Sequence, residues 1–509
     1  MNDGVLATHG HDDPSPVNAV GAHFEVLIIG AGLSGIGAAC HLVRKRPKTT
    51  FAILEARDAI GGTWDLFRYP GIRSDSDMST FGYAFRPWDD SKAIADGPSI
   101  LRYLAETAKA YGVDRHIRFG LKVLWASWRT ADARWALDVD GPDGQKLRLS
   151  CNFLFLCTGY YEYDEGYMPG WPGIERFGGR VVHPQKWPED LKHDGKRVVV
   201  IGSGATAVTI VPAMAPRAAH IVMLQRSPTY VVARPAEEAI AERLKQWLPA
   251  RAAHAAVRWK NILLQMYLYR ISRRKPAAVR AQIIKLAQAE IGPEFNAAEY
   301  FEPRYNPWDQ RMCIVPDGDL FAAMRAGKAS IVNGEIETFT ETGLRLTSGQ
   351  EIAADIIVTA TGLNVRLMGG VAIEVDGAPV DIATTTAYKG VMFSDIPNLA
   401  SIFGYTNASW TLKSDLIAEY VCRLLSHMDR RGYAICTPRR GDTAIADGPT
   451  LPLTSGYIER AKHLLPKQGT GKPWRMNQNY ALDVMALRFA AIEDGALEFR
   501  RRGPIRDAA

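Results

Sequence analysis

The chain has 509 residues, of which 47% are hydrophobic and 23% charged, and it carries a formal net charge of +6. This composition is ordinary for a globular protein, and a chain of this length suggests about three domains. No run of about 18 apolar residues occurs, which excludes a transmembrane helix. The six cysteines form no C-x-x-C pair, which argues against a disulfide framework or a thiol–disulfide redox centre. We therefore expect a cytoplasmic protein with reduced thiols.

The chain begins with a polar segment, residues 1–22, that has no basic stretch followed by an apolar run. This segment does not have the pattern of a signal peptide, and we expect it to be a disordered tail. The next segments alternate in pattern: 24–29 is a short apolar run, 36–46 has helical spacing, and 50–54 is apolar again. Strand, helix and strand in this order predict a βαβ unit.

A glycine-rich turn, Gly30-Ala31-Gly32-Leu33-Ser34-Gly35, joins the first of these strands to the helix. In a G-x-G-x-x-G turn the first glycine permits the bend, the second lets the backbone approach a pyrophosphate, and the third lets helix and strand pack closely. Glu55 ends the second strand, where an acid can hold the hydroxyl pair of a ribose. The glycines alone would also fit an ordinary loop. With strand, helix and terminal acid in place, they predict a dinucleotide site.

Alternating apolar and polar residues over 121–128 and 134–139, a turn at 140–144 and an apolar run at 147–157 predict a small antiparallel meander within this unit. The last part of that run, 153–157, has the pattern of a strand that returns to the parallel sheet.

A second βαβ unit follows, with strands at 197–201 and 221–225 around the turn Gly202-Ser203-Gly204-Ala205-Thr206-Ala207. Its second strand ends in Gln225-Arg226-Ser227 instead of an acid. Arg226 can pair with a 2′-phosphate and Ser227 can donate a hydrogen bond to it, which favours NADP over NAD. The alternative is that Arg226 is an ordinary surface arginine. Two dinucleotide sites, one acidic and one basic, predict FAD together with NADPH.

From Pro235 to Pro307 the pattern is helical, and residues 242–290 hold eleven basic residues against two glutamates. Four aromatic residues lie among these cations: Trp247, Trp259, Tyr267 and Tyr269. We expect a solvated helical face that covers the substrate cleft; the alternative is a weak peripheral contact with anionic lipid. An apolar strand returns at 352–358, and a helical C-terminal part begins near Ala408.

This order of segments predicts an α/β fold with two nested Rossmann-like dinucleotide-binding domains, whose nucleotide sites face each other across a cleft, and a helical insertion. The expected limits are 1–22 for the tail, 23–160 with 366–509 for the FAD-binding domain, 161–233 with 309–365 for the NADPH-binding domain, and 234–308 for the insertion. We expect no metal site, and no motif supports nucleic-acid binding. The sequence assigns no oligomeric state.

Two longer motifs narrow the class of protein. Residues 61–75, Gly-Gly-Thr-Trp-Asp-Leu-Phe-Arg-Tyr-Pro-Gly-Ile-Arg-Ser-Asp, fit the pattern [AG]-G-x-W-x4-[FY]-P-[GM]-x3-D. Phe177, Gly179, His183, Trp187 and Pro188 fit F-x-G-x3-H-x3-W-P. With these two motifs the chain resembles the Baeyer–Villiger monooxygenases from about residue 24 to near residue 500. Residues 309–311 and 405–410 resemble the branch of that family whose mycobacterial member activates ethionamide.

The resemblance implies a cytoplasmic enzyme that contains FAD and consumes NADPH and O2. In that family, a flavin C4a-peroxide converts ketones to esters or lactones, and the same intermediate can oxidise sulfides and thioamides. By family position Arg311 is the catalytic cation near the developing oxyanion, and Asp75 orients its guanidinium. From the residues alone, Arg311 would equally fit a surface or salt-bridge arginine. The sequence from Ser74 to Asp77 would also fit a helix cap.

The resemblance also implies further site residues. In the first unit the FAD contacts are Ser34, Thr63, Trp64, Asp65, Leu66 and the backbone of Val123. Flavin and nicotinamide meet near Arg73, Ser74 and Asp75, and the NADPH pyrophosphate lies over Ser203 to Thr209, a stretch that includes Val208. We interpret His183 as part of a hinge between domains, with a general base as the alternative, and Trp187 as a packing anchor.

One residue departs from the family pattern, because Gln310 stands where many members have a lysine that helps to bind the 2′-phosphate. NADPH preference would then depend more strongly on Arg226. Three other functions remain open at this stage: a flavin-dependent S- or N-oxygenase without ketone activity, an NADPH oxidase or flavin reductase, and a non-catalytic nucleotide-binding flavoprotein. Ketone turnover to esters separates the first from the Baeyer–Villiger class. Substrate-stimulated NADPH oxidation separates an enzyme from a non-catalytic protein.

Overall fold

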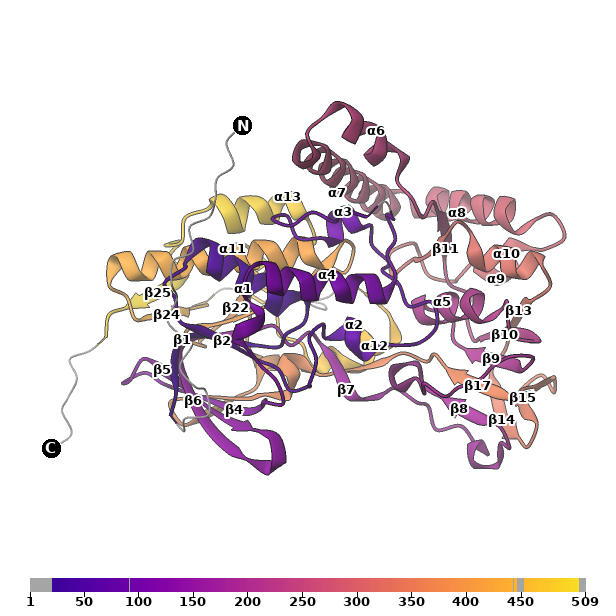
Figure 1. Ribbon diagram of the computed structural model, residues 1–509, viewed down its shortest axis with the longest axis horizontal. Helices are drawn as coiled ribbons and strands as arrows, with labels where there is room; N and C mark the ends of the chain where they lie inside the picture. Colours follow the sequence, from indigo (N-terminus) through magenta and orange to yellow (C-terminus); the bar gives the residue numbers. More distant parts are fainter. Residues whose placement is uncertain (1–20, 91, 443, 446–452, 503–509) are drawn as a thin grey trace.

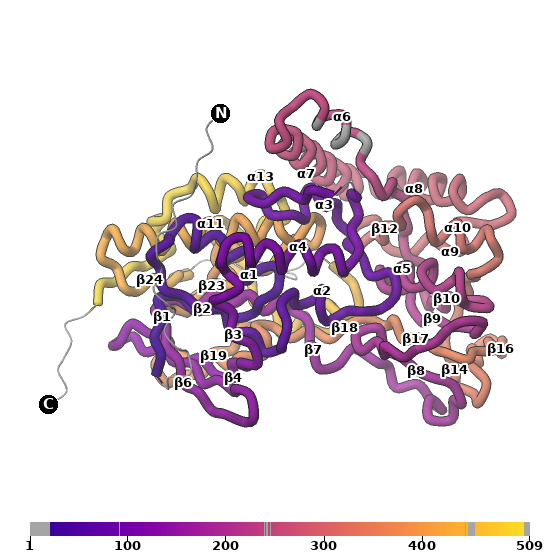
Figure 2. The backbone as a smooth tube through the Cα atoms, viewed as in Figure 1, coloured from indigo at the N-terminus to yellow at the C-terminus, as the bar shows by residue number. Residues whose placement is uncertain are grey.

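The computed structural model describes residues 21–90, 92–442, 444–445 and 453–502. The tail expected over 1–22 therefore lies, except for its last two residues, outside the described part. Two lobes, each built on its own sheet, lie side by side, and a pair of helices projects from the upper edge (Figure 1). The smooth trace of Figure 2 shows the chain passing from the first lobe to the second and back again.

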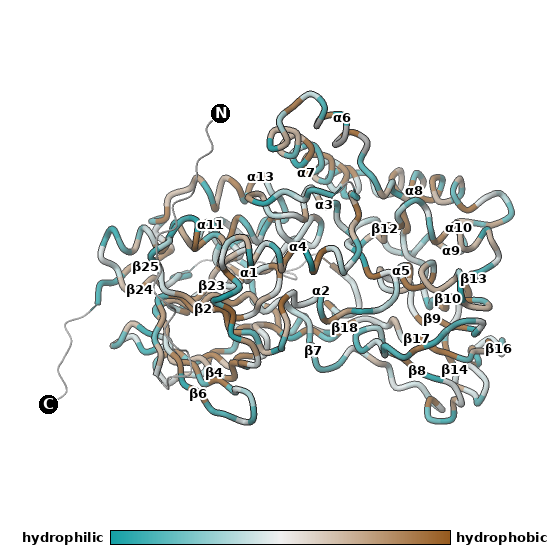
Figure 3. Tube along the Cα trace, in the orientation of Figure 1, coloured by the Kyte–Doolittle hydropathy of each residue, from teal (hydrophilic) through white to brown (hydrophobic). Residues whose placement is uncertain are grey.

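The first lobe contains a nine-stranded mixed sheet in the order β20-β19-β4-β5-β6-β1-β2-β3, with β23 also pairing with β6. β6 pairs antiparallel with β5 along its first half and parallel with β1 along its second, as the meander and the returning strand predicted. Its inner strands are among the most hydrophobic parts of the trace (Figure 3). The strands are β1 His23–Ile29, β2 Phe51–Leu54, β3 Ile117–Arg118, β4 Lys122–Arg129, β5 Arg134–Asp140, β6 Lys146–Leu156, β19 Ala372–Val375, β20 Ala378–Val380 and β23 Leu399–Ser401.

Helices cover this sheet, and short elements line its carboxyl edge. The predicted helix after the first turn is α1, Leu33–Lys45, and the C-terminal helix is α11, Trp410–Arg431, against which α1 packs. The part after 408 is not wholly helical, because β24 and β25 form an antiparallel pair there. The remaining elements of this lobe are α2 Thr63–Leu66, α3 Met78–Phe81, α4 Gly97–Ala110, β21 Ala387–Tyr388, β22 Met392–Phe393, β24 Ile435–Pro438, α12 Gly456–Ala461, α13 Tyr480–Asp483 and β25 Leu497–Arg500.

The second lobe contains a five-stranded parallel sheet in the order β13-β10-β9-β17-β8. A three-stranded antiparallel sheet, β14-β15-β16, is attached to it. The elements are β8 Arg180–Val182, β9 Arg197–Ile201, α5 Ala205–Met214, β10 His220–Gln225, α10 Asp319–Arg325, β13 Ala329–Asn333, β14 Ile336–Thr340, β15 Gly343–Leu346, β16 Glu351–Ala353 and β17 Ile356–Thr359.

The single strand predicted over 352–358 is wrong, because the structure has two strands there that belong to different sheets. Asp355 lies in the break between them. Its carboxylate accepts a hydrogen bond from the backbone N–H of Arg197 at 2.8 Å and pairs with the guanidinium of the same residue. This contact anchors the chain beside β9, so that the apolar run leaves the antiparallel sheet and enters the parallel one.

Two strand pairs connect the lobes and the insertion. β7, Tyr161–Gly166, pairs antiparallel with β18, Leu363–Val365, where the chain crosses between the two sheets. The proposed domain limits at 160/161 and 365/366 fall at this pair. β11, Val231–Arg234, pairs parallel with β12, Cys313–Pro316, at the two ends of the insertion. The insertion itself is helical, as predicted, with α6 Ala239–Trp247, α7 Ala250–Arg274, α8 Pro276–Ile291 and α9 Ala297–Phe301.

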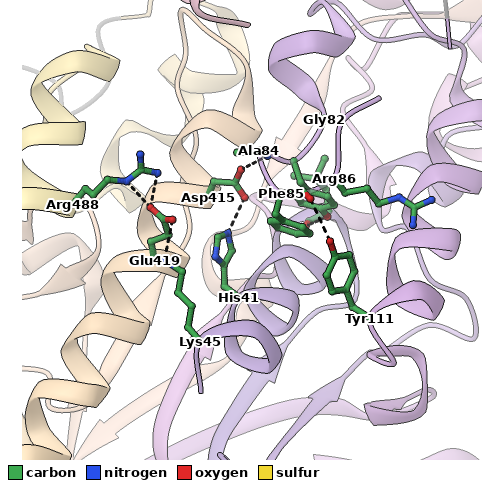
Figure 4. A network of polar contacts seen from close by, with 12 residues as sticks. His41, Lys45, Gly82, Ala84, Phe85, Arg86, Tyr111, Asp415, Glu419 and Arg488 are labelled. Atoms are coloured by element: carbon green, nitrogen blue, oxygen red, sulfur yellow. Dashed lines mark hydrogen bonds and ion pairs between the residues drawn. The ribbon is translucent and has the colours of Figure 1, made fainter. Parts of the chain in front are cut away.

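A buried polar network ties α1 to α11 (Figure 4). His41 Nε2 lies 3.1 Å from Asp415 Oδ1, and Asp415 Oδ2 accepts a hydrogen bond from the backbone N–H of Ala84 at 2.9 Å. Arg258 from α7 lies 3.8 Å from the same carboxylate. Desolvation raises the pKa of Asp415, but the hydrogen bond and charge of His41 and the charge of Arg258 outweigh it, so that the pKa falls below its ordinary value. The network therefore holds the first lobe and the insertion together.

All six cysteines are free and buried. Burial raises the pKa of each thiol, for example to about 12 for Cys313 and Cys436. Among the described residues, no helix is both long and apolar enough to cross a bilayer.

Candidate active site

The first glycine-rich turn is held tightly against its surroundings. Gly30 has a φ of +102°, and a Cβ there would lie 2.7 Å from the carbonyl oxygen of Cys157. A Cβ on Gly35 would lie 1.8 Å from the carbonyl oxygen of Gly30, so only glycine permits this packing of α1 on β1. Glu55 accepts hydrogen bonds from the backbone N–H groups of Ala31, at 2.7 Å, and Arg57, at 3.0 Å. Burial raises the pKa of Glu55.

The second turn has the same backbone arrangement, but its middle glycine is not packed against other atoms. Gly202 has a φ of +133°, and a Cβ there would lie 2.3 Å from the carbonyl oxygen of Ala360. A Cβ on Gly204 would meet nothing within 4 Å, so the backbone is open there. The hydroxyl of Ser203 donates to the carbonyl of Ser227 at 3.0 Å and lies 2.9 Å from the Thr229 hydroxyl. This side chain therefore fastens the loop after β10 to the turn.

Both turns open onto one cleft of about 700 Å³, as the nested order of segments predicted. The two units therefore share a single cavity in which two nucleotides can meet. The predicted site residues that line it are Gly30, Gly32, Ser34, Glu55, Thr63, Trp64, Arg73, Ser74, Asp75, Val123, Gly204, Ala205, Thr206, Thr209 and Arg311, and Gln310 lines it as well.

Other predicted residues lie outside the lining of the cleft. Asp65 is buried, and its carboxylate pairs with Arg57 at 2.5 Å and Arg68 at 3.0 Å. Arg226 and Ser227 stand exposed beside the second turn. The remaining predicted residues also lie outside the lining: Gly35, Leu66, Gly202, Ser203, Ala207 and Val208. None of the residues described between 238 and 301 lines this cleft, so the insertion does not cover it in the way we expected.

Arg311 and Asp75 meet in the cleft although 236 positions separate them in the chain. Arg311 Nη1 donates to Asp75 Oδ2 at 2.9 Å, and Nη2 donates to the carbonyl oxygen of Tyr405 at 3.4 Å. Desolvation lowers the pKa of Arg311, but the Asp75 carboxylate and nearby tyrosines outweigh it and raise the pKa above its ordinary value. The guanidinium therefore stays charged and is oriented from two sides.

Asp75 is not the helix cap that the sequence alternatively suggested. The cap of α3 is Asp77, whose carboxylate accepts a hydrogen bond from the backbone N–H of Thr80 at 3.0 Å. Asn261 and Gln265 of α7 donate to the same carboxylate at 2.9 and 2.8 Å. Because Asp77 caps α3, the carboxylate of Asp75 is available to pair with Arg311.

The rest of the first long motif joins the two units. Gly62 packs against Gly32 of the first turn, where an added Cβ would lie 3.1 Å from the neighbouring Cα. Gly71 has a φ of +75°, and a Cβ there would lie 2.6 Å from Ala213 Cβ on α5. Arg73 forms an ion pair with Asp319 at the start of α10, so it is already bound across the junction. The motif therefore contacts the first glycine-rich turn at one end and the second lobe at the other.

The second long motif packs against the strand pair β7–β18, where the chain passes from one lobe to the other. The backbone N–H of Gln185 donates to His183 Nδ1 at 3.2 Å, which leaves the proton on Nε2 to donate to the Gly362 carbonyl at 3.3 Å. Burial lowers the pKa of His183, which favours this neutral form. A Cβ on Gly166 of β7 would lie 1.9 Å from the His183 ring. With both nitrogens engaged and the ring against the crossing strands, the geometry favours a hinge over a general base.

Phe177, Gly179 and Trp187 of the same motif serve packing. Phe177 is buried beside Phe339 in the core between the two sheets of the second lobe. A Cβ on Gly179 would lie 2.3 Å from the carbonyl oxygen of Asp355, which requires glycine. Trp187 packs half-buried against the core of the parallel sheet.

The sequence did not lead us to predict three tyrosines beside Arg311, namely Tyr160, Tyr161 and Tyr457. Tyr160 and Tyr161 join their hydroxyls at 2.8 Å, and Tyr160 stacks on Trp410 at 5.4 Å. Tyr457 comes from α12, and all three tyrosines interact electrostatically with Arg311. Trp410 Nε1 donates to the Ser34 hydroxyl at 2.9 Å. The run Tyr-Tyr-x-Tyr, which begins four residues after the end of β6, was an available signal for Tyr160 and Tyr161. Nothing local indicated Tyr457.

Comparisons with known proteins identify relatives along most of the chain. The chain is 53% identical over 481 residues to the FAD-containing monooxygenase EthA of Mycobacterium tuberculosis strain H37Rv, covering 94% of this chain and 98% of that one. It is 48% identical over 480 residues to EthA of Mycolicibacterium smegmatis, covering 94% and 97%.

Solved structures share the fold at low sequence identity. An oxidized steroid monooxygenase bound to NADP gives a TM-score of 0.74 at 22% identity, covering 94% of this chain and all of that one. A cyclohexanone monooxygenase bound to ε-caprolactone gives 0.72 at 19% identity with the same coverage. The profile of the flavin-binding monooxygenase-like proteins matches residues 24–368. The chain therefore belongs to the flavin-binding monooxygenase-like family.

Proposed function

We propose that this chain is a FAD-containing, NADPH- and O2-dependent monooxygenase of the Baeyer–Villiger type, which converts ketones to esters or lactones. The observation that carries the proposal is the Arg311–Asp75 pair, a fixed cation in the cleft onto which both nucleotide turns open. Relatives named as FAD-containing and a fold neighbour bound to NADP support the same cofactors.

The first unit fits FAD. Gly32 carries no side chain at the centre of its turn, where the N-terminus of α1 offers N–H groups to a pyrophosphate. Glu55 uses one lone pair of each oxygen on backbone N–H groups, so both oxygens can still accept from ribose hydroxyls. Trp64, Val123 and Tyr163 line the cleft as well.

The second unit fits NADPH. Gly204 is open, so a pyrophosphate can approach the N-terminus of α5. Arg226 is exposed and has no ion-pair partner among the described residues, which leaves its guanidinium available to a 2′-phosphate.

Bound FAD, once reduced by NADPH, supplies the activated oxygen. The protein supplies a charge that does not move: Arg311 faces the cleft, and its raised pKa keeps it from giving up a proton. A fixed guanidinium stabilises the negative charge that develops on the carbonyl oxygen of a ketone under attack. Asp75 and the Tyr405 carbonyl fix its direction, and Tyr160, Tyr161 and Tyr457 line the cleft beside it.

The first experiment follows NADPH oxidation by the purified yellow protein with and without phenylacetone, and identifies the products by mass. Ester formed in step with NADPH consumption is the expected result. Arg311→Ala should retain FAD but lower ester formation by at least about a hundredfold, whereas Arg304→Ala, which removes an exposed arginine outside the cleft, should not. Full ester formation by Arg311→Ala would overturn the assignment. Oxidation of a sulfide with no ester from any ketone would instead favour an S-oxygenase.

A further inference from the structure

The exposed large hydrophobic side chains of the described residues gather on one surface. Eleven of the eighteen lie on α6, at Leu248 just after it, on α7 or within residues 482–489. The most exposed are Trp247 at 84%, Phe489 at 65%, Met485 at 61%, Tyr267 at 60% and Leu263 at 58%. We call this set of eleven the insertion face: Ile240, Trp247, Leu248, Trp259, Leu263, Leu264, Tyr267, Leu268, Leu482, Met485 and Phe489.

The two parts of the insertion face adjoin each other. The ring of Trp259 on α7 meets that of Tyr480 on α13 at 5.8 Å. α6, α7 and α13 all lie along the same upper edge of the molecule (Figure 1). Trp259, Leu263 and Tyr267 recur at a spacing of four residues, which places them on one side of α7.

α7 buries a mixed side, with Val257 and Ile262 beside polar residues, and its exposed side between 259 and 268 is mainly apolar, unlike that of an ordinary surface helix. On the inner side, Arg258 donates to the carbonyls of Ser79 and Gly82 at 2.8 and 2.7 Å. Asn261 and Gln265 bind Asp77 on that side as well. The exposed residues of α7 between 259 and 268 are mainly apolar, which favours the alternative of a contact with another surface over the solvated face that the sequence favoured.

Basic residues predominate around the apolar residues, and of these Arg258, Lys260 and Arg273 pair with carboxylates from outside the segment. Residues 243–289 hold eleven basic residues and no Asp or Glu. Arg251, Arg270, Arg274 and Lys275 stand exposed on or beside α7, and none of the four forms an ion pair with any described residue. A second copy of the chain would bring the same positive charge against this one. The charge favours an anionic occupant.

We propose that the insertion face docks on the surface of an anionic phospholipid bilayer. Tryptophan, tyrosine and leucine flanked by arginine are the side chains that lie at the boundary of headgroups and acyl chains. Because none of the described helices is able to span a bilayer, the contact is peripheral. The inference is independent of the oxidation chemistry, because no residue of the face lines the cleft.

The test uses the FAD-loaded full chain and sedimentation with two kinds of vesicle, pure phosphatidylcholine and phosphatidylcholine mixed with phosphatidylglycerol. The wild type should bind the mixed vesicles far more tightly than the neutral ones, and salt should weaken that binding. The triple variant R251Q/R270Q/R274Q should lose about a hundredfold in affinity for the mixed vesicles, at roughly a fivefold loss for each charge. L263S/Y267S should lose about tenfold or more on both kinds of vesicle.

Two control variants make the same kinds of substitution at exposed residues outside the insertion face. K48Q/K192Q/K328Q removes three exposed charges, and F119S/L464S removes two exposed apolar side chains, in each case away from the insertion face. Both controls should bind vesicles like the wild type, and all four variants should keep wild-type NADPH oxidation. Absence of vesicle binding, or binding that the face variants leave unchanged, would overturn the proposal. So would a lipid-free dimer that L263S/Y267S converts to monomers, since a second copy would then be the occupant.

Discussion

The two nucleotide units are built on one plan, yet the first is closed by its own packing and the second is left open. In the first, Gly35 is so close to Gly30 that no side chain fits, and the carboxylate of Glu55 is buried against the turn. In the second, the third position of the turn is Ala207, Gly204 faces open space, and the charged residue that ends the strand, Arg226, is exposed.

Under the proposed assignment of FAD to the first unit and NADPH to the second, the difference corresponds to how long each ligand stays. A resident cofactor such as FAD is best held by a rigid, desolvated cradle, because every group that holds it is already in place. A cofactor that arrives and departs in each cycle, as NADPH does, is better served by an open turn and an exposed charge that captures its phosphate. The variants below, ordered by expected effect, test whether the two units differ in this way.

The largest effect on FAD retention is expected from Gly35→Ala. Its Cβ would overlap the Gly30 carbonyl, and overpacking of this kind costs about 1–3 kcal/mol or more, so FAD retention should fall about tenfold or further. The ratio of flavin to protein absorbance in the purified variant measures this. The matched change in the second unit, Ala207→Gly, should leave the flavin content unaltered. A fully yellow Gly35→Ala protein would mean that the first turn is not the rigid cradle described here.

Asp415→Asn should lower the free energy of unfolding by about 3–5 kcal/mol, because it leaves His41 and Arg258 without their buried carboxylate. The pKa of Asp415 is lowered in the folded protein, so its stabilisation is present above the unfolded pKa of about 4 and is lost as the pH falls through the folded value. The difference in melting temperature between the wild type and the Asp415→Asn variant should therefore become smaller at acidic pH. Asp355→Asn, which breaks a partly exposed pair in the second lobe, should cost only about 0–1 kcal/mol.

Arg226→Ala should raise KM for NADPH about 10- to 100-fold with little change in kcat, since a charge-assisted contact to the 2′-phosphate contributes about 1.5–3 kcal/mol. KM for NADH and the flavin content should stay as in the wild type. Steady-state kinetics with both nicotinamide cofactors separate the outcomes. An equal rise in KM for NADPH and NADH would assign Arg226 to the fold of the loop instead of to the phosphate.

Gly204→Ala should have the smallest effect on stability, within about 0.5 kcal/mol, because its Cβ meets nothing within 4 Å. The same methyl group would stand where a pyrophosphate approaches the backbone, so KM for NADPH should rise severalfold. Gly202→Ala is the contrast, since its Cβ would clash with the Ala360 carbonyl and destabilise the protein. If Gly204→Ala leaves KM for NADPH unchanged, the pyrophosphate does not lie over this turn.

Sequence reasoning succeeded where structure depends on neighbours in the chain. The two βαβ units, the meander and the helical insertion all follow from local periodicity and glycine spacing. It failed at 352–358, where one apolar run is divided by the contact of Asp355 with Arg197, 158 positions away. It could not choose between cap and catalytic pairing for Asp75, because the choice depends on Arg311 from the other end of the fold.

Those residues of the candidate site that belong to a continuous sequence motif could be predicted, and the others could not. The glycines, Glu55 and the residues from Thr63 to Asp75 belong to continuous patterns, whereas Arg311 stood out only through the family resemblance. Tyr457 lies on a short helix that reaches the cleft from far along the chain, and no local pattern indicates such a contact. The chemical roles of these residues remain predictions for the experiments above.

The six buried cysteines have a consequence for the lifetime of such a catalyst. A flavin enzyme that turns over without substrate releases hydrogen peroxide beside its own polypeptide, and thiolates are the side chains that hydrogen peroxide attacks most readily. Here burial raises the pKa of every thiol, to about 12 in Cys40, Cys313, Cys422 and Cys436, so almost no thiolate forms at neutral pH. Oxidative damage should begin instead at exposed sulfur such as that of Met485 and Met168, outside the cleft, where it spares the chemistry.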